Sequence, residues 1–82
     1  MNDQPRRRVR EGILRHLEIY PDGSDTPEGI RRWWLPAEDA NVEPALLNEV
    51  LEDFVAAGIM RRRRLPDGGV VYVASPRDRS RG

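Results

Sequence analysis

A run of four arginines at positions 61–64 is the feature of this chain whose residue type and spacing best suit a binding chemistry. Apolar residues precede the run and a turn sequence follows it, which is typical of a β-strand. Because side chains alternate between the two faces of a strand, either Arg61 and Arg63 or Arg62 and Arg64 project to the same side. Such a pair of guanidinium groups could contact nucleic-acid phosphates, or it could simply cover exposed sheet and pair with acids.

Other arginines gather near the two ends of the chain, where they could extend a phosphate contact. All 14 basic residues are arginine, and they balance 14 acids, so the net charge is zero. A neutral chain weakens the case for nucleic-acid binding, because any basic surface has to be local. The group near the start comprises Arg6, Arg7, Arg8 and Arg10, and the group near the end comprises Arg77, Arg79 and Arg81. Both groups could lie on the same side of the molecule as the run at 61–64.

An amphipathic helix is predicted over residues 43–57, just before the arginine run. Pro44 suits its first turn and Gly58 suits the position after its last turn. Its apolar residues recur at spacings of three and four and so share one buried side, namely Leu47, Val50, Leu51, Phe54 and Val55.

The opposite face of this helix is acidic. Asn48 lies on that face and could pair with the edge of an adenine, whereas carboxylates are repelled by phosphates that line a groove. The face comprises Glu43, Asn48, Glu49, Glu52 and Asp53. Its charge argues against base reading by this helix and suits contact with another protein.

A β-hairpin is predicted immediately after the helix. Its strands cover residues 59–65 and 70–74, and the second strand is rich in β-branched and aromatic residues. Between them lies Pro66-Asp67-Gly68-Gly69, which supplies the backbone preferences of a tight reversal.

Two further helices are predicted upstream. The first covers about residues 8–19, on an apolar stripe made of Val9, Ile13, Leu17 and Tyr20. The second is short, begins with either Thr26 or Asp25 as its cap, and ends before Pro36. The intervening residues 21–25 are almost entirely polar, so a strand there is expected to be vestigial or absent.

Two adjacent tryptophans lie on the short helix, on the side that also carries Ile30. Neighbouring residues on a helix are about 100° apart, so at most one of Trp33 and Trp34 points straight into the core. We expect both to cover the small core from different angles. The alternative is that one of them is exposed and available to a partner.

This order of elements resembles the winged helix-turn-helix superfamily over residues 8–75. The stretch Ala56-Ala57-Gly58-Ile59-Met60-Arg61, with Leu65-Pro66-Asp67-Gly68-Gly69-Val70-Val71-Tyr72, looks like the passage from third helix to wing. The resemblance implies a small α+β fold of three helices followed by a hairpin wing. Residues 1–7 and 76–82 are expected to be flexible tails.

The resemblance implies nucleic-acid binding and a role in transcription regulation. DNA would be held through phosphates by Arg6, Arg7, Arg8 and the four arginines of the wing, with Asn48 as the base-edge candidate. The alternative is an adaptor that binds a protein through Trp33 or Trp34 and through Glu49 and Glu52. A regulator this small would need a homodimer or a larger complex to gain specificity.

No catalytic or metal-binding pattern is recognisable in the sequence. His16 is the only histidine, there is no cysteine, and no nucleophile is placed beside His16 by its spacing. We therefore expect a non-enzyme without a cofactor. The 82 residues suffice for one modest core. They include neither a membrane-spanning stretch nor a signal peptide, which favours the cytoplasm.

Overall fold

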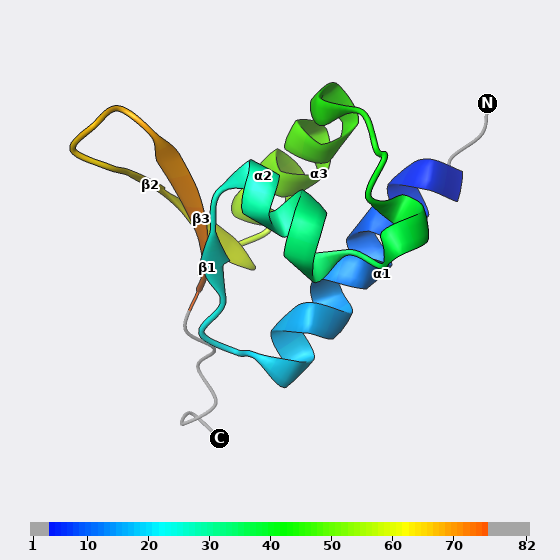
Figure 1. Ribbon diagram of the computed structural model, residues 1–82. Coiled ribbons are helices and arrows are strands. Elements are labelled where there is room, and N and C mark those ends of the chain that lie inside the picture. The colour runs from blue at the N-terminus through cyan, green and yellow to red at the C-terminus, as the bar shows by residue number, and fades with distance from the viewer. Residues whose placement is uncertain (1–3, 76–82) are drawn as a thin grey trace, which may run out of the picture.

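Three antiparallel strands form one layer of the fold and the helices form the other, in a computed structural model that describes residues 4–75 (Figure 1). This arrangement confirms the predicted small α+β class. In chain order the elements are α1 (Gln4–Ile19), β1 (Ser24–Asp25), α2 (Pro27–Gly29), the π-helical η1 (Ile30–Trp34), the 3-10 helix η2 (Ala37–Asp39), α3 (Pro44–Ala56), β2 (Met60–Arg64) and β3 (Val70–Ala74).

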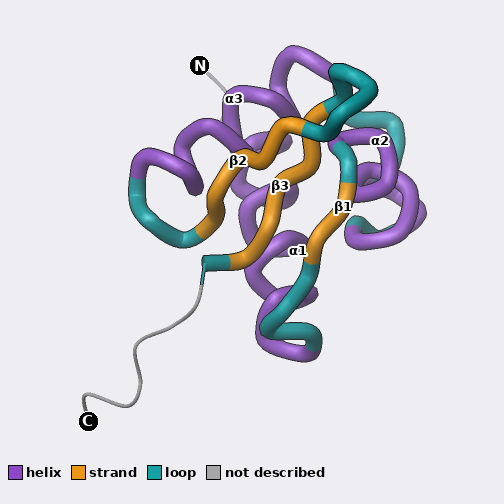
Figure 2. The backbone as a smooth tube through the Cα atoms, turned by 90° about the vertical axis from the view of Figure 1, so that its left-hand side faces the viewer, coloured by secondary structure: helices purple, strands orange, loops and turns teal. Residues whose placement is uncertain are grey.

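The sheet has the strand order β1-β3-β2, so the last strand lies in its centre. Strands β2 and β3 pair along their whole length, from Met60 opposite Ala74 to Arg64 opposite Val70. Strand β1 has only two residues, and Ser24 lies opposite Val73. The strand between the first two helices is thus vestigial, one of the two predicted outcomes. Figure 2 shows the sheet in front with the helices behind it.

Both ends of α3 follow the sequence signals. Glu43 precedes the helix in an extended conformation and Pro44 occupies its first turn. At the other end Gly58 has a φ of +80°, which a residue with a side chain rarely adopts. The Gly58 N–H donates to the Val55 carbonyl and the Ile59 N–H donates to the Phe54 carbonyl, which together close the helix as a Schellman motif. This closure turns the chain directly into β2.

Helix α1 is longer than the apolar stripe indicates. The stripe predicts a start at residue 8 after a flexible arm, but the helix begins at Gln4, so that prediction is wrong for residues 4–7. Pro5 lies in the first turn, where its missing N–H costs no hydrogen bond, and arginine is a good helix former. Residues 1–3 and the predicted tail at 76–82 lie outside the described residues.

The short second helix begins at the Thr26 cap, one of the two predicted starts. The Thr26 hydroxyl accepts the Gly29 N–H at 3.0 Å, while the Asp25 carboxylate accepts the Thr26 N–H at 2.8 Å. The helix continues as the π-helical η1 and ends at Leu35, which is extended ahead of Pro36. This ending confirms the effect of the proline.

The core is apolar and is shared by all the main elements. Tyr20 was expected on the buried stripe of α1, but it follows the last helical residue and is 56% exposed. Trp34 is buried at 7% exposure, whereas Trp33 is 73% exposed, so the expectation that both cover the core is wrong. The buried residues are Val9, Ile13, Ile30, Trp34, Leu35, Leu47, Val50, Leu51, Phe54, Met60 and Tyr72.

Loss of the Thr26 cap is expected to destabilise the fold. In Thr26→Ala the Gly29 N–H loses its acceptor, and the free energy of unfolding should fall by about 1 kcal/mol in urea denaturation. Thr26→Ser keeps the hydroxyl and should retain most of the stability. Equal stability of Thr26→Ala and the unaltered chain would contradict a capping role.

Candidate functional site

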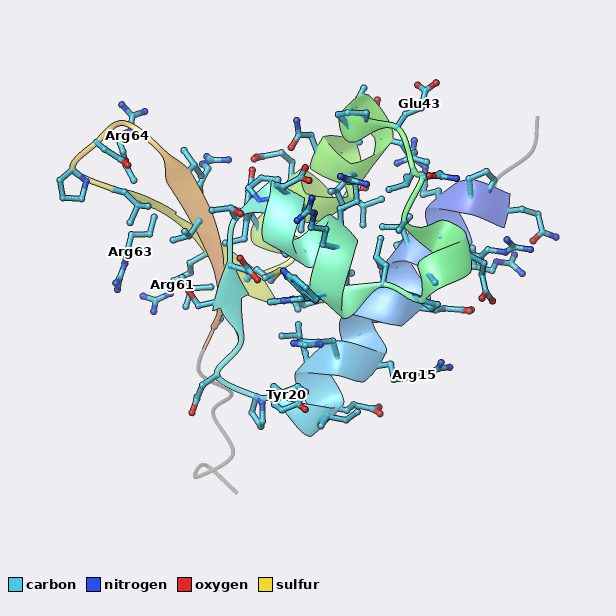
Figure 3. All side chains as sticks on the ribbon, in the orientation of Figure 1. Arg15, Tyr20, Glu43, Arg61, Arg63 and Arg64 are labelled. Carbon is cyan, nitrogen blue, oxygen red and sulfur yellow. The ribbon has the colours of Figure 1, made fainter. Side chains whose placement is uncertain are left out.

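The position of Met60 decides which arginines of β2 face outward. Met60 is 1% exposed and belongs to the core, so residue 62 faces the helices and residues 61 and 63 face away from them. Figure 3 shows Arg61 and Arg63 projecting together from the outer face of the hairpin, while Arg64 projects from near its tip in another direction. The outward pair is therefore Arg61 and Arg63.

Arg62 is held by a cluster that links the hairpin to α3. Its guanidinium forms an ion pair with Glu52, and the Tyr72 hydroxyl donates a second hydrogen bond to the same carboxylate at 2.7 Å. These hydrogen bonds, first from Arg62 and then from Tyr72, lower the pKa of Glu52 below its ordinary value. Arg62 thus secures the hairpin against α3.

Arginines of α1 pair with further acids. The Arg6 guanidinium lies 2.6 Å from a Glu49 carboxylate oxygen and 3.8 Å from one of Asp53. The Arg8 guanidinium lies 3.4 Å from Asp39 of η2. Three of the predicted phosphate contacts, Arg6, Arg8 and Arg62, are therefore engaged with carboxylates, and the acidic face of α3 is partly neutralised.

The arginines without an acidic partner among residues 4–75 include the outward pair. The side chains of Arg7, Arg61, Arg63 and Arg64 make no hydrogen bond or ion pair there, and all are exposed. The beginning of α1 and the tip of the hairpin lie at opposite ends of the molecule (Figure 1). Only Arg6 of α1 and Arg62 of the hairpin approach one another's surroundings among the described contacts, since both pair with acids on the same face of α3. Arg77, Arg79 and Arg81 lie outside the described residues.

Asn48 and the acids of α3 lie together on an exposed surface. A shallow hollow on this surface is lined by Arg6, Asn48, Glu49, Glu52 and Asp53. Asn48 is exposed and could reach a ligand, but it is surrounded by three carboxylates. The carboxylates around Asn48 therefore oppose base reading by this helix, as the sequence indicates.

A second hollow, the aromatic hollow, lies between the end of α1, β1 and η1. Its lining includes His16, Ile19, Tyr20, Trp33 and Trp34, together with residues 21–25. Glu49 and Glu52 line the separate hollow on α3, so the tryptophan region and the acidic helix do not form one joint surface. Sequence analysis missed Ile19 and Tyr20 as surface residues, although Ile19 falls outside the apolar stripe.

His16 is packed among the aromatic rings of this hollow. Its ring stacks on Trp34 at 4.2 Å between centroids, with 10° between the planes, and lies 4.7 Å from Tyr20. Burial lowers the pKa of His16 below its ordinary value of 6.5, while the nearby Asp25 carboxylate acts in the opposite direction. The imidazole is therefore neutral at pH 7.

Two classes of site find no support in the part of the chain that the structure describes. Residues 4–75 contain no cluster of three or more histidines and acids that could hold a metal ion. None of their helices combines the length and hydropathy that a bilayer crossing needs. Comparison of the chain with family models, curated proteins and solved structures finds no match in any of the three.

Removal of Arg62 is expected to release the Glu52 carboxylate. In Arg62→Ala the pKa of Glu52 should rise toward that of an ordinary glutamate, because the larger of its two stabilising hydrogen bonds is lost. A carbon-detected NMR titration of the side-chain carboxyl measures this pKa. Arg63→Ala removes an outward arginine and should leave it unchanged, and the same pKa in both variants would contradict the pairing.

Burial of His16 is expected to make stability depend on pH. The unfolded chain takes up a proton on His16 at a higher pH than the folded chain, so the free energy of unfolding should decrease as the pH falls below the ordinary histidine pKa of 6.5. Urea denaturation at a series of pH values on either side of 6.5 measures the slope. His16→Gln should show a flatter profile, and identical profiles would contradict the lowered pKa.

Proposed function

We propose that this chain is a winged-helix protein that binds nucleic acid through backbone phosphates. Its wing is the hairpin of β2 and β3, and its ligand is double-stranded DNA held with little sequence specificity. This activity would suit a small component of transcription regulation.

The order of the elements supports a winged-helix scaffold. A strand of two residues lies between α1 and α2, and a hairpin follows the third helix, as in the superfamily that the sequence resembles. The hairpin extends beyond the layer of helices at one end of the molecule (Figure 1). It can therefore approach a long, charged surface without a clash from the helices.

The observation that carries the proposal is the outward pair, Arg61 and Arg63. Both side chains are exposed and have no acidic partner among residues 4–75, and with Arg64 they concentrate positive charge in a neutral chain. Residues two apart on a strand lie about 7 Å from each other along it. Two guanidinium groups at this spacing can contact separate phosphates and release counterions.

The acidic face of α3 supports low sequence specificity. Arg6 and Arg62 reduce its charge but do not reverse it, because Glu49 and Asp53 both face Arg6 and Glu52 alone faces Arg62. Contacts to phosphates position a protein on DNA without reading bases. Asn48 is the remaining candidate for a base contact, and its carboxylate neighbours oppose entry of the helix into the groove.

Replacement of the outward pair is expected to weaken DNA binding and its salt dependence. For Arg61→Ala/Arg63→Ala, the slope of log K against log salt concentration should become shallower by about 2, because each phosphate contact contributes about 0.9. Fluorescence anisotropy with a mixed-sequence duplex measures the slope.

The matched control removes the same charge from α1. Arg7→Ala/Arg15→Ala alters two exposed arginines away from the hairpin, and Arg15 lies well below it in Figure 3. This variant should keep the original slope. An equal decrease of the slope in the two double variants would mean that only the net charge of the chain affects DNA binding. Absence of DNA binding by the unaltered chain at low salt would contradict the proposal.

A further inference from the structure

The aromatic hollow concentrates exposed apolar surface that the DNA-binding proposal does not use. Ile19 is 63% exposed, Tyr20 56% and Trp33 73%, and all three line it. Large exposed apolar side chains grouped in this way mark binding surfaces more often than isolated ones do. Tryptophan and tyrosine are also the residues that most often dominate binding energy at protein interfaces.

The floor of the hollow is already ordered by stacking. Trp34 is buried in the core, and the His16 ring stacks on it. The Tyr20 ring in turn lies against the His16 ring. Little side-chain freedom would be lost at the floor on binding, which favours affinity. Trp33 also lines the hollow and is mostly exposed, so its ring is accessible to a ligand group.

The charge of the hollow selects the kind of ligand. Its ionisable residues include the carboxylates of Asp22 and Asp25, and none of its lining residues is an arginine, although the chain has 14. His16 is neutral at pH 7 because burial lowers its pKa. The Asp25 carboxylate already accepts the Thr26 N–H, while Asp22 is exposed and makes no hydrogen bond or ion pair through its side chain within residues 4–75. An anion is disfavoured here and a cation is favoured.

We propose that the aromatic hollow binds an arginine side chain presented by a partner protein. A planar guanidinium can stack on the faces of Trp33 or Tyr20 and at the same time donate hydrogen bonds to the Asp22 carboxylate. Apolar neighbours of that arginine in the partner would cover Ile19. This surface shares no residue with the outward pair on the hairpin.

The test uses the full chain and two short peptides of sequence Leu-Arg-Leu and Leu-citrulline-Leu with blocked ends. Citrulline keeps the shape of arginine and removes its charge. In a ¹H–¹⁵N NMR titration, the indole N–H of Trp33 and the amides of residues 20–25 should shift saturably with the arginine peptide. The citrulline peptide should bind about tenfold more weakly, because cation–π and ionic contacts are lost.

Two substitutions distinguish this surface from general attraction. Asp22→Asn should weaken binding of the arginine peptide severalfold, and Trp33→Ala should abolish the saturable shifts. Both variants should still fold, since both side chains are exposed and neither belongs to the core. Glu18→Gln removes a carboxylate of α1 that does not line the hollow and should leave the affinity unchanged. Arg61→Ala/Arg63→Ala should likewise leave it unchanged, which separates this result from the outcome of the DNA experiment.

Several results would overturn the proposal. Equal binding of the two peptides would show an apolar contact without selection for charge. Shifts of the same resonances on dilution without peptide would assign the hollow to a second copy of this chain. The absence of a saturable shift with the arginine peptide would likewise exclude an arginine site.

Discussion

Burial of Met60 is the constraint on which the arrangement of the hairpin arginines depends. Because Met60 lies in the core at the start of β2, Arg62 is turned toward α3, and Arg61 and Arg63 are turned away from it. A shift of the strand by one residue would expose Met60 and exchange the two sets of arginines. An apolar side chain therefore determines which guanidinium groups meet carboxylates and which remain available to a ligand.

The neutral composition conceals an uneven distribution of charge. Arginines from both sides of α3 meet its acids, since Arg6 comes from α1 and Arg62 comes from β2. These contacts are exposed, and each contributes little to stability by itself. Their larger effect is on the surface potential, because they reduce the charge of α3 and leave the hairpin positive. The aromatic hollow, with its two aspartates, lies apart from α3 and β2, between the end of α1, β1 and η1.

The parts of the fold that sequence analysis predicted have local signals. Helix α3 has an apolar stripe and Gly58 at its end, and the hairpin has a turn sequence between β-forming residues. The beginning of α1 has no apolar residue before Val9, so its first turn could not be recognised. The pairing of Arg6 with Glu49 joins residues 43 apart in the chain, and no local pattern encodes it. The exposure of Trp33 depends on how the π-helical turn packs, which periodicity does not determine.

The position of β2 in the sheet gives its arginines a consequence that does not depend on any ligand. With the order β1-β3-β2, β2 is an edge strand, and in the described part of the chain no further strand pairs with it. Such an edge is a template for the growth of a sheet from one molecule to the next. Two β2 edges that met would bring together the guanidinium groups of Arg61, Arg63 and Arg64 from each molecule, and the repulsion between these groups opposes aggregation.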